Sequence, residues 1–313
     1  MASLAIGSTE MTPCAYLGPA GTFAHQAAID LAGPSAELVA ESDVESVIGG
    51  ISAGRYVSGI VPFENSQEGE VGASLDIIAS LGGEPVLVAE RVLPVTFTLF
   101  RWPGDDVPLT EVSSHPFALA QCSRYSATNG LTEIPAASTA RACQELASSR
   151  TPGRGAIGAP NAGGVYGLEA VAAGIETHGG ALTRFVKLGA HCEGPTIRDR
   201  TAFVVRPEMD QPGGLMRILQ QFSLRSINLT AITSRPARNR LGNYWFYLEC
   251  EGHILQNDIK EAVMNILLDG GDITFLGSFP EDPSRPVASV PTDSAAAYRR
   301  YSAMRGRVAD ADA

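Results

Sequence analysis

The sequence predicts an α/β protein of two lobes, followed by a smaller α+β domain. Over residues 14–190, strand-like and helix-like apolar patterns alternate, as in layered folds with parallel strands. A long, apolar and extended stretch at 86–100 interrupts this alternation and is typical of a crossover between two lobes. After a polar link at 190–200, the pattern changes to strand–helix–strand–strand–helix–strand.

The composition argues against a nucleic-acid-binding or membrane protein. Of the 313 residues, 44% are hydrophobic and 18% are charged, so the chain can bury a normal core. The formal net charge is -11, and no basic cluster stands out before the tail. No apolar run is long enough to span a bilayer, and residues 1–13 lack the basic start and the apolar core of a signal peptide.

The cysteine content favours a reducing, cytoplasmic setting. The five cysteines are an odd number and show neither a CxxC pair nor the spacing of a metal site. We expect each to be a small buried hydrophobe. They are Cys14, Cys122, Cys143, Cys192 and Cys250.

The first lobe is expected to begin with a strand at 14–17 and a Gly-rich turn at 18–23. Backbone N–H groups in such a turn, at the start of a helix, bind anions with help from the helix dipole. Thr22 is the expected N-cap of the helix that follows. The turn is therefore a candidate contact for an anionic ligand.

A polar cluster at 63–71 directly follows the next buried strand, 59–62. Ser42 and Glu45 form a capping-box pattern for the helix that precedes this strand. Ligands of open α/β sheets bind beyond the carboxyl ends of the strands. We therefore expect the cluster to contact a ligand before the chain enters another helix at 71–78.

The second lobe repeats the strand–helix pattern. Pro116 predicts a helix start beside His115, which is expected to be a structural or surface residue rather than a base. Ser138 and Thr139 are expected to cap the next helix, and a helical turn is expected at 166–168. The expected strands are 111–113, 134–136 and 156–159.

A hydroxyl, a guanidinium and an aromatic ring lie in a row at the start of an apolar strand, 182–188. These residues are Thr183, Arg184 and Phe185. Such a group is suited to giving a proton to a leaving group while holding an anion.

The second domain is expected to follow the ferredoxin-like plan, because its elements alternate as βαββαβ. Its expected strands are 201–205, 227–233, 244–248 and 273–276, with helices after 212–214 and around 259–267. A turn is expected at 241–243. The Pro-, Ser- and Ala-rich composition of 281–313 predicts a mobile tail.

Taken together and in order, several motifs resemble the monofunctional prephenate dehydratases. The resemblance covers residues 14–280. In the α/β part it rests on 16–23, 61–66, His115-Pro116 with Gln121-Cys122, and 183–185. In the second domain, 212–215 and 233–236 are similar to the family's regulatory ACT domain.

The resemblance implies a catalytic domain at 14–190, like type II periplasmic binding proteins, that converts prephenate to phenylpyruvate for L-phenylalanine biosynthesis. Thr183 matches the family's catalytic threonine, which helps the ring hydroxyl to leave. No metal or cofactor is expected, since aromatisation drives the step. The implied substrate-binding residues are Thr22, Asn65, Ser66, Ser138, Thr139, Arg184 and Phe185.

The resemblance also implies feedback inhibition by L-phenylalanine, bound at an ACT domain spanning 199–280. Such sites form where two ACT domains meet, which implies a homodimer or homotetramer. The implied contact residues are Gly213, Gly214, Leu215, Asn228, Leu229, Ser234, Arg235 and Pro236.

Three positions depart from the family's pattern. Ala181 replaces an Asn, Phe63 replaces an Ile that is expected to shape the cleft, and Thr233 replaces a Glu of the regulatory motif. These departures leave open a non-aromatising prephenate decarboxylase. A non-catalytic amino-acid sensor and arogenate as the substrate are further alternatives.

Overall fold

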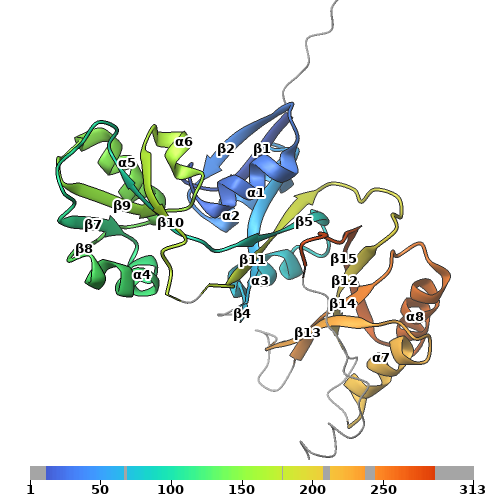
Figure 1. Ribbon diagram of the computed structural model, residues 1–313. Coiled ribbons are helices and arrows are strands. Elements are labelled where there is room, and N and C mark those ends of the chain that lie inside the picture. The colour runs from blue at the N-terminus through green and yellow to red at the C-terminus, as the bar shows by residue number, and fades with distance from the viewer. Residues whose placement is uncertain (1–11, 67–68, 178, 207–211, 237–243, 286–313) are drawn as a thin grey trace, which may run out of the picture. The chain divides into compact units, whose positions relative to one another are not determined.

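The computed structural model describes residues 12–66, 69–177, 179–206, 212–236 and 244–285 (Figure 1). Met1–Asp282 form one compact unit, and only 283–285 are described of the second unit, Pro283–Ala313. The expected mobile tail therefore lies almost wholly outside the described residues, as does the turn expected at 241–243. Within the described part, no helix is both long and apolar enough to cross a membrane.

The first lobe contains a mixed sheet, whereas the sequence pattern predicted parallel strands. Its order is β2-β1-β3-β11-β5, and the short β4 (Gly69–Glu70) pairs with β3. β1 (Thr12–Leu17) runs parallel to β2 (Ala36–Glu41) and β3 (Ser58–Asn65). β11 (Leu182–Gly189) runs antiparallel to β3 and to β5 (Val86–Pro94), because it enters the sheet on the chain's return from the second lobe. The helices are α1 (Phe23–Ala32), α2 (Val44–Ser52) and α3 (Gly72–Ser80).

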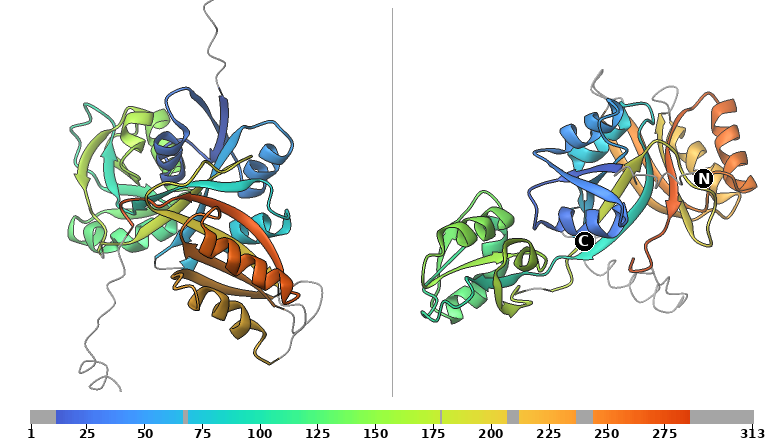
Figure 2. Two further views of the ribbon diagram at one scale, coloured as in Figure 1. Left: turned by 90° about the vertical axis from the view of Figure 1, so that its right-hand side faces the viewer. Right: turned by 90° about the horizontal axis from the view of Figure 1, so that it is seen from above.

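The second lobe has its own sheet, in the order β10-β6-β9-β7-β8. The crossover predicted at 86–100 is confirmed, because β5 belongs to the first sheet and β6 to the second. The chain returns through β10 and β11, so two segments join the lobes (Figure 2). The strands are β6 (Thr98–Arg101), β7 (Glu111–Ser114), β8 (Thr132–Pro135), β9 (Arg154–Gly158) and β10 (Glu169–Ala173); the helices are α4 (Pro116–Thr128), α5 (Thr139–Ser149) and α6 (Ala162–Tyr166).

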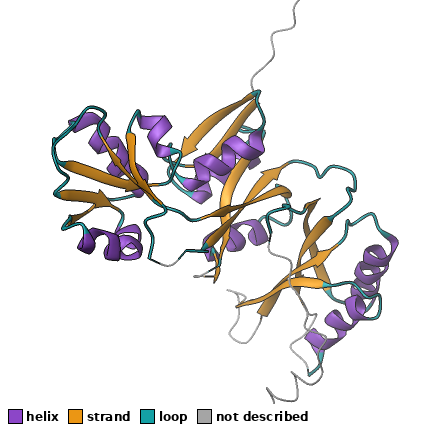
Figure 3. Ribbon diagram, in the orientation of Figure 1, coloured by secondary structure: helices purple, strands orange, loops and turns teal. Residues whose placement is uncertain are grey.

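A third, antiparallel sheet follows in the order β13-β14-β12-β15, with α7 and α8 on one face (Figure 3). Side chains alternate across it, as they must in a strand. Phe203 and Val205 pack in one cluster with residues of α7 and α8, whereas Ala202 and Val204 share a cluster with Val186 of the first lobe. The elements are β12 (Asp199–Arg206), α7 (Gly214–Ser223), β13 (Leu229–Pro236), β14 (Tyr244–Glu251), α8 (Asn257–Leu268) and β15 (Asp272–Pro280). The sheet is therefore covered on both faces.

Local capping patterns predicted most helix starts correctly. Thr22 caps α1, and its hydroxyl accepts a hydrogen bond from the N–H of His25 at 3.1 Å. Ser138 caps α5 in the same way. The capping box predicted for Ser42 and Glu45 was wrong. Asp43, the residue directly before α2, is the N-cap, and its carboxylate accepts from the N–H of Ser46 at 2.7 Å.

Besides the two-residue β4, two strands were missed, β2 and β10. Both are rich in Ala and Glu, which favour helices in isolation. Pairing with β1 and β6 overrides this preference, since strand formation depends mainly on packing with neighbouring strands.

We predict that Gly277→Ala lowers the free energy of unfolding by about 3 kcal/mol, a typical size for backbone strain plus a clash. Gly277 has a φ of 145°, in the region that favours glycine. A Cβ there would collide with the backbone of Leu87, lying 2.7 Å from its nitrogen and closer still to its carbonyl oxygen.

Urea unfolding measures this loss. Gly49→Ala in α2 is the control, because no atom lies within 4 Å of its added Cβ, and we expect it to be neutral or stabilising by about 0.5–1 kcal/mol. Equal stability of the two variants would contradict the prediction.

Candidate active site

The start of β11 carries the expected catalytic hydroxyl. Thr183 pairs with Asn65 on β3 and with Leu93 on β5. The side-chain amide of Asn65 donates a hydrogen bond to the Thr183 hydroxyl oxygen at 3.1 Å. Because that oxygen already accepts from Asn65, the hydroxyl hydrogen is left to point toward another acceptor.

Ser66 fixes the same corner of the sheet. Its backbone N–H donates to the Leu182 carbonyl at 2.9 Å, and its hydroxyl accepts from the Leu182 N–H at 2.9 Å. The polar loop after β3 is thus joined to the first residues of β11. The structure brings three predicted residues together: Asn65, Ser66 and Thr183.

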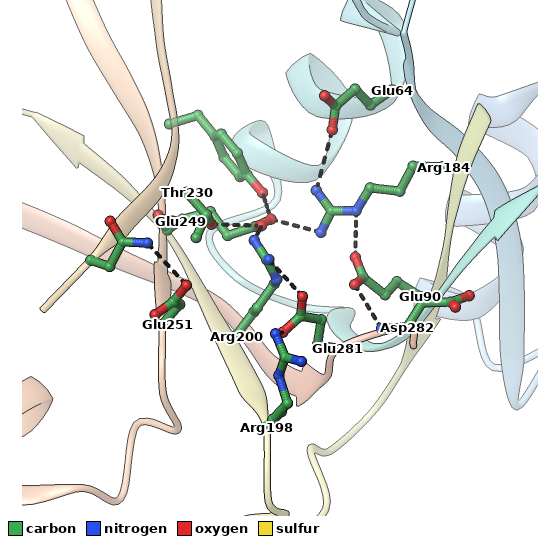
Figure 4. Close-up of polar contacts among 12 residues, drawn as sticks. Glu64, Glu90, Arg184, Arg198, Arg200, Thr230, Glu249, Glu251, Glu281 and Asp282 are labelled. Carbon is green, nitrogen blue, oxygen red and sulfur yellow. Dashed lines mark hydrogen bonds and ion pairs between the residues drawn. The ribbon is translucent and has the colours of Figure 1, made fainter. Parts of the chain in front are cut away.

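The Arg184 side chain lies in a buried charge cluster (Figure 4). Its Nε lies 2.6 Å from a carboxylate oxygen of Glu90, and Nη2 lies 2.6 Å from one of Glu249. A third carboxylate, Glu64, lies 3.6 Å from Nη1. The Arg184 side chain is 4% exposed and those of Glu90 and Glu249 are fully buried.

The electrostatics of this cluster keep Arg184 charged. Burial alone would lower the pKa of its guanidinium, but Glu249 and Glu90 raise that pKa well above its ordinary value. Burial, together with the charge of Glu249, raises the pKa of Tyr247 far above its ordinary value, so the phenol stays neutral. The Tyr247 hydroxyl donates to Glu249 at 2.7 Å.

The geometry corrects three expectations from the sequence. Arg184 was expected to bind a substrate carboxylate, but two fully buried carboxylates of the chain occupy its guanidinium. Phe185 was expected to contact substrate, but it is 3% exposed and packs with Tyr16 beneath α1. Phe63 was expected to shape the cleft, but its ring packs 5.6 Å from that of Tyr247, on the side of the third sheet.

The Gly-rich turn contacts the second lobe. The Tyr166 hydroxyl donates to the Ala20 carbonyl at 2.6 Å, and the Asn161 amide donates to the Thr22 carbonyl at 3.2 Å. The N–H of Gly21, expected to bind an anion, donates instead to Nδ1 of His25 at 3.1 Å. Thr22 lies at the contact between the lobes, while its hydroxyl caps α1.

The second lobe contains the other predicted substrate-side residues. The Ser138 hydroxyl accepts from the N–H of Arg141 at 3.0 Å and so begins α5, in which Thr139 is the first residue. His115 caps α4 through Nδ1, as expected of a structural residue. Burial raises the pKa of Cys122 to about 12, so its thiol is an unreactive core group.

The residues predicted to bind an effector lie on α7 and β13 or directly before them. Gly213 has a φ of 82° and precedes α7, whose first residues are Gly214 and Leu215. Asn228 donates to the Glu251 carboxylate at 2.9 Å. Leu229, Ser234, Arg235 and Pro236 belong to β13.

Arg235 reaches the first lobe. Its Nε lies 3.7 Å from the Asp76 carboxylate of α3. A Cβ built on Gly72, the first residue of α3, would lie 2.5 Å from Nη2 of Arg235. The end of β13 therefore packs against the helix that follows the polar loop of the site.

Sequence reasoning missed Glu90, Glu249, Asn161 and Tyr166. Glu90 and Glu249 occur within strands, where the alternation pattern gives no sign that an acidic side chain is buried. Among the described residues, no group of three or more His, Cys, Asp and Glu side chains could hold a metal ion.

The sequence of the chain is similar to those of known proteins of one family. Residues 14–193 match the family model described as prephenate dehydratase. A prephenate dehydratase from Mycolicibacterium smegmatis is 36% identical over 288 residues, which cover 87% of this chain and 91% of the relative.

Solved structures agree on the fold. The crystal structure of a prephenate dehydratase in complex with L-Phe, from Arthrobacter aurescens, has a TM-score of 0.75 and 32% identity, covering 94% of this chain and 98% of that one. GqqA, described as a novel type of quorum quenching acylase, has a TM-score of 0.77 at 22% identity, covering 88% of this chain and 100% of that one. The second likeness shows the fold alone.

We predict that Arg184→Met lowers the free energy of unfolding by about 3–5 kcal/mol, the usual cost of removing one partner from a buried ion pair. In this variant Glu90 and Glu249 stay buried but lose the cation that both of them contact. Urea unfolding measures the effect.

The control is Arg141→Met. Arg141 forms an ion pair with Glu145 at 2.8 Å on the surface of α5, with both side chains more than half exposed. We expect a loss below about 0.5 kcal/mol there. A similarly small loss for Arg184→Met would show that the cluster contributes little to stability.

Proposed function

We propose that this chain, which belongs to the prephenate dehydratase family, converts prephenate to phenylpyruvate as a carbon–oxygen lyase. Family membership supports the reaction, and one observation carries the mechanism: the Thr183 hydroxyl oxygen accepts a hydrogen bond from Asn65. This leaves the hydroxyl hydrogen available for the substrate.

The chemistry needs such a donor. When the bond to the ring carboxylate breaks, carbon dioxide leaves and its electron pair moves into the ring. The bond to the ring hydroxyl then breaks, and hydroxide is a poor leaving group unless it receives a proton and leaves as water. A threonine hydroxyl is too weak an acid to act by its pKa, so we propose that Thr183 acts by position in a site that excludes water. Solvent restores the proton of Thr183 when the products leave.

The surrounding residues are assigned by their contacts. Asn65 positions the Thr183 hydroxyl rather than binding substrate, and Ser66 fixes the adjoining backbone. Thr22, Ser138 and Thr139 remain our candidates for substrate oxygens, because each lies at the start of a helix, where anions are favoured. Neither Arg184 nor Phe185 is among them.

Two departures from the family pattern leave the Thr183–Asn65 pair intact. The Phe63 ring is 1% exposed and packs on Tyr247. Ala181 is 3% exposed and belongs to an apolar cluster with Val95. The contacts of these two residues give no support to a non-aromatising decarboxylase. The assay below distinguishes that activity from dehydration. The same assay with arogenate tests the other substrate.

For the chain's organisation, we propose a catalytic domain at 14–190 and a ferredoxin-like ACT domain at 199–280. The βαββαβ order and the antiparallel sheet β13-β14-β12-β15 support this assignment. A cytoplasmic location is supported by five cysteines that are all free thiols.

We further propose that L-phenylalanine inhibits the enzyme by binding the ACT domain in a homodimer or homotetramer. A related structure contains L-Phe. The proposed contacts are Gly213, Gly214, Leu215, Asn228, Leu229, Ser234, Arg235 and Pro236.

We predict that Thr183→Ala lowers kcat on prephenate by about a hundredfold or more, the usual contribution of a positioned donor. Thr183→Ser keeps a hydroxyl and serves as the control, with a loss of about tenfold or less because only the methyl group changes. Phenylpyruvate is measured by its absorbance.

Unchanged turnover in Thr183→Ala would remove the donor role. Consumption of prephenate without phenylpyruvate would identify a non-aromatising decarboxylase. A wild-type protein that leaves prephenate unchanged would favour the sensor.

We predict that wild-type turnover falls as L-phenylalanine is added, and that Asn228→Ala raises the half-inhibitory concentration about tenfold, the effect of losing about 1.4 kcal/mol of binding free energy. Each rate is expressed relative to the same variant without ligand. L-alanine is the matched control ligand. Equal inhibition of the two proteins would remove Asn228 from the effector site.

A further inference from the structure

The β-ladder between β3 and β11 is interrupted beside Thr183. Thr183 pairs with Asn65 and Arg184 with Glu64, but Phe185 pairs with Pro62. Phe63 is therefore the extra residue of a β-bulge. Thr183 and Arg184 pair regularly with β3 on one side of this bulge, and Phe185 pairs on the other. Bulges break the ladder locally and re-aim neighbouring side chains, so the direction of the Thr183 side chain also depends on how Arg184 is held.

The Arg184 side chain provides a further anchor beside the bulge. Its guanidinium carbon lies 5.3 Å from the ring centre of Phe63 and 5.6 Å from that of Phe279. Glu90 binds Nε from β5, the strand that pairs with β11 on its other side. Glu249 binds Nη2 from β14, in the third sheet (Figure 4). Glu249 is thus the charged contact, beside the ring of Phe279, through which the third sheet holds this part of β11.

Glu249 is itself held rigidly. One of its carboxylate oxygens accepts from Arg200 at 3.0 Å and from the Thr230 hydroxyl at 3.0 Å. The other accepts from Tyr247 at 2.7 Å and from Arg184 at 2.6 Å. Three donors of the third sheet therefore hold the Glu249 carboxylate in place. The fourth donor, Arg184 of β11, binds to this fixed carboxylate.

We infer that Glu249 is a positioning residue for Thr183 in the reaction proposed above, on which this inference rests. By fixing Arg184, it sets the place of the adjacent Thr183 hydroxyl relative to Asn65 across the bulge. The proposed active site is therefore incomplete without a side chain from the third sheet, although Glu249 touches no substrate.

A positioning role and a purely structural role predict different results. If Glu249 only stabilises the fold, its removal lowers the amount of folded enzyme and leaves kcat per folded molecule unchanged. If it positions Thr183, its removal lowers kcat of the folded enzyme with little change in KM. Its effect must also depend on the Thr183 hydroxyl being present.

The main variant is Glu249→Gln, which keeps the size of the side chain and removes its charge. We expect kcat per folded molecule to fall about tenfold to a hundredfold, since small misplacements of a reacting group have effects of this order. KM should change less than about threefold, because Glu249 does not contact substrate. An unchanged kcat, with wild-type enzyme active, overturns the inference and leaves the proposed function standing.

A milder variant and a matched control accompany it. Tyr247→Phe removes one donor from the same oxygen that Arg184 uses and keeps the ring packed against Phe63. We expect a loss of about threefold, and this variant decides the question if Glu249→Gln does not fold. Glu261→Gln removes the same charge from an exposed side chain of α8, and its kcat should stay within about 1.5-fold of wild type.

A double-mutant cycle separates the two roles further. On a Thr183→Ala background, Glu249→Gln should change kcat by less than about twofold, because the group that it positions is absent. A full multiplicative loss on that background overturns the inference.

Hydrogen–deuterium exchange tests the inference without turnover. Glu249→Gln should speed exchange in peptides spanning 180–189 about tenfold relative to Glu261→Gln, because the anchor of the bulged segment is weakened. If wild-type protein does not convert prephenate, the proposed function fails, and equal exchange in the two variants then overturns the anchoring by Glu249 as well.

Discussion

The buried charge of Arg184 is the constraint on which the rest of the structure depends. A guanidinium that is 4% exposed is tolerable only when carboxylates surround it. The chain provides them from three strands in two sheets: Glu64 on β3, Glu90 on β5 and Glu249 on β14. Separating the third sheet from the first lobe would break the ion pair of Arg184 with Glu249. The apolar cluster shared by Val186, Val204 and Tyr247 reinforces the same junction.

Two consecutive residues of β11 therefore have separate tasks. Thr183 contacts Asn65 at the edge of the polar loop, and Arg184 reaches the third sheet. Alternation along a strand makes this division possible, because neighbouring side chains point to opposite faces. β11 lies between β3 and β5, and so it carries both the proposed catalytic hydroxyl and the central cation of the buried ion cluster. The guanidinium of Arg184 is bound to carboxylates of the chain and is not among the proposed substrate-binding groups.

The contact between the two lobes is of a different kind. It includes neutral hydrogen bonds from Tyr166 to Ala20 and from Asn161 to Thr22, and the edge of Phe23 against Phe97. The first lobe and the third sheet share a buried apolar cluster that includes Val186 and Val204, which their separation would expose to water. We therefore expect the lobes to separate more readily than the first lobe and the third sheet, which suits a site that must admit and release a ligand.

The sequence by itself determined the features that depend on neighbours along the chain. Apolar periodicity predicted most helices and strands, Thr22 and Ser138 identified two caps, and the motif at 183–185 marked the strand that carries the proposed catalytic hydroxyl. The tertiary structure alone decided the antiparallel place of β11, the pairing of Thr183 with Asn65, 118 residues away, and the burial of Arg184 against Glu249, 65 residues away. A guanidinium before an apolar strand looks the same in sequence whether it binds a substrate or a buried glutamate. The difference lies in which carboxylate folding brings within hydrogen-bond distance, and no local pattern specifies that.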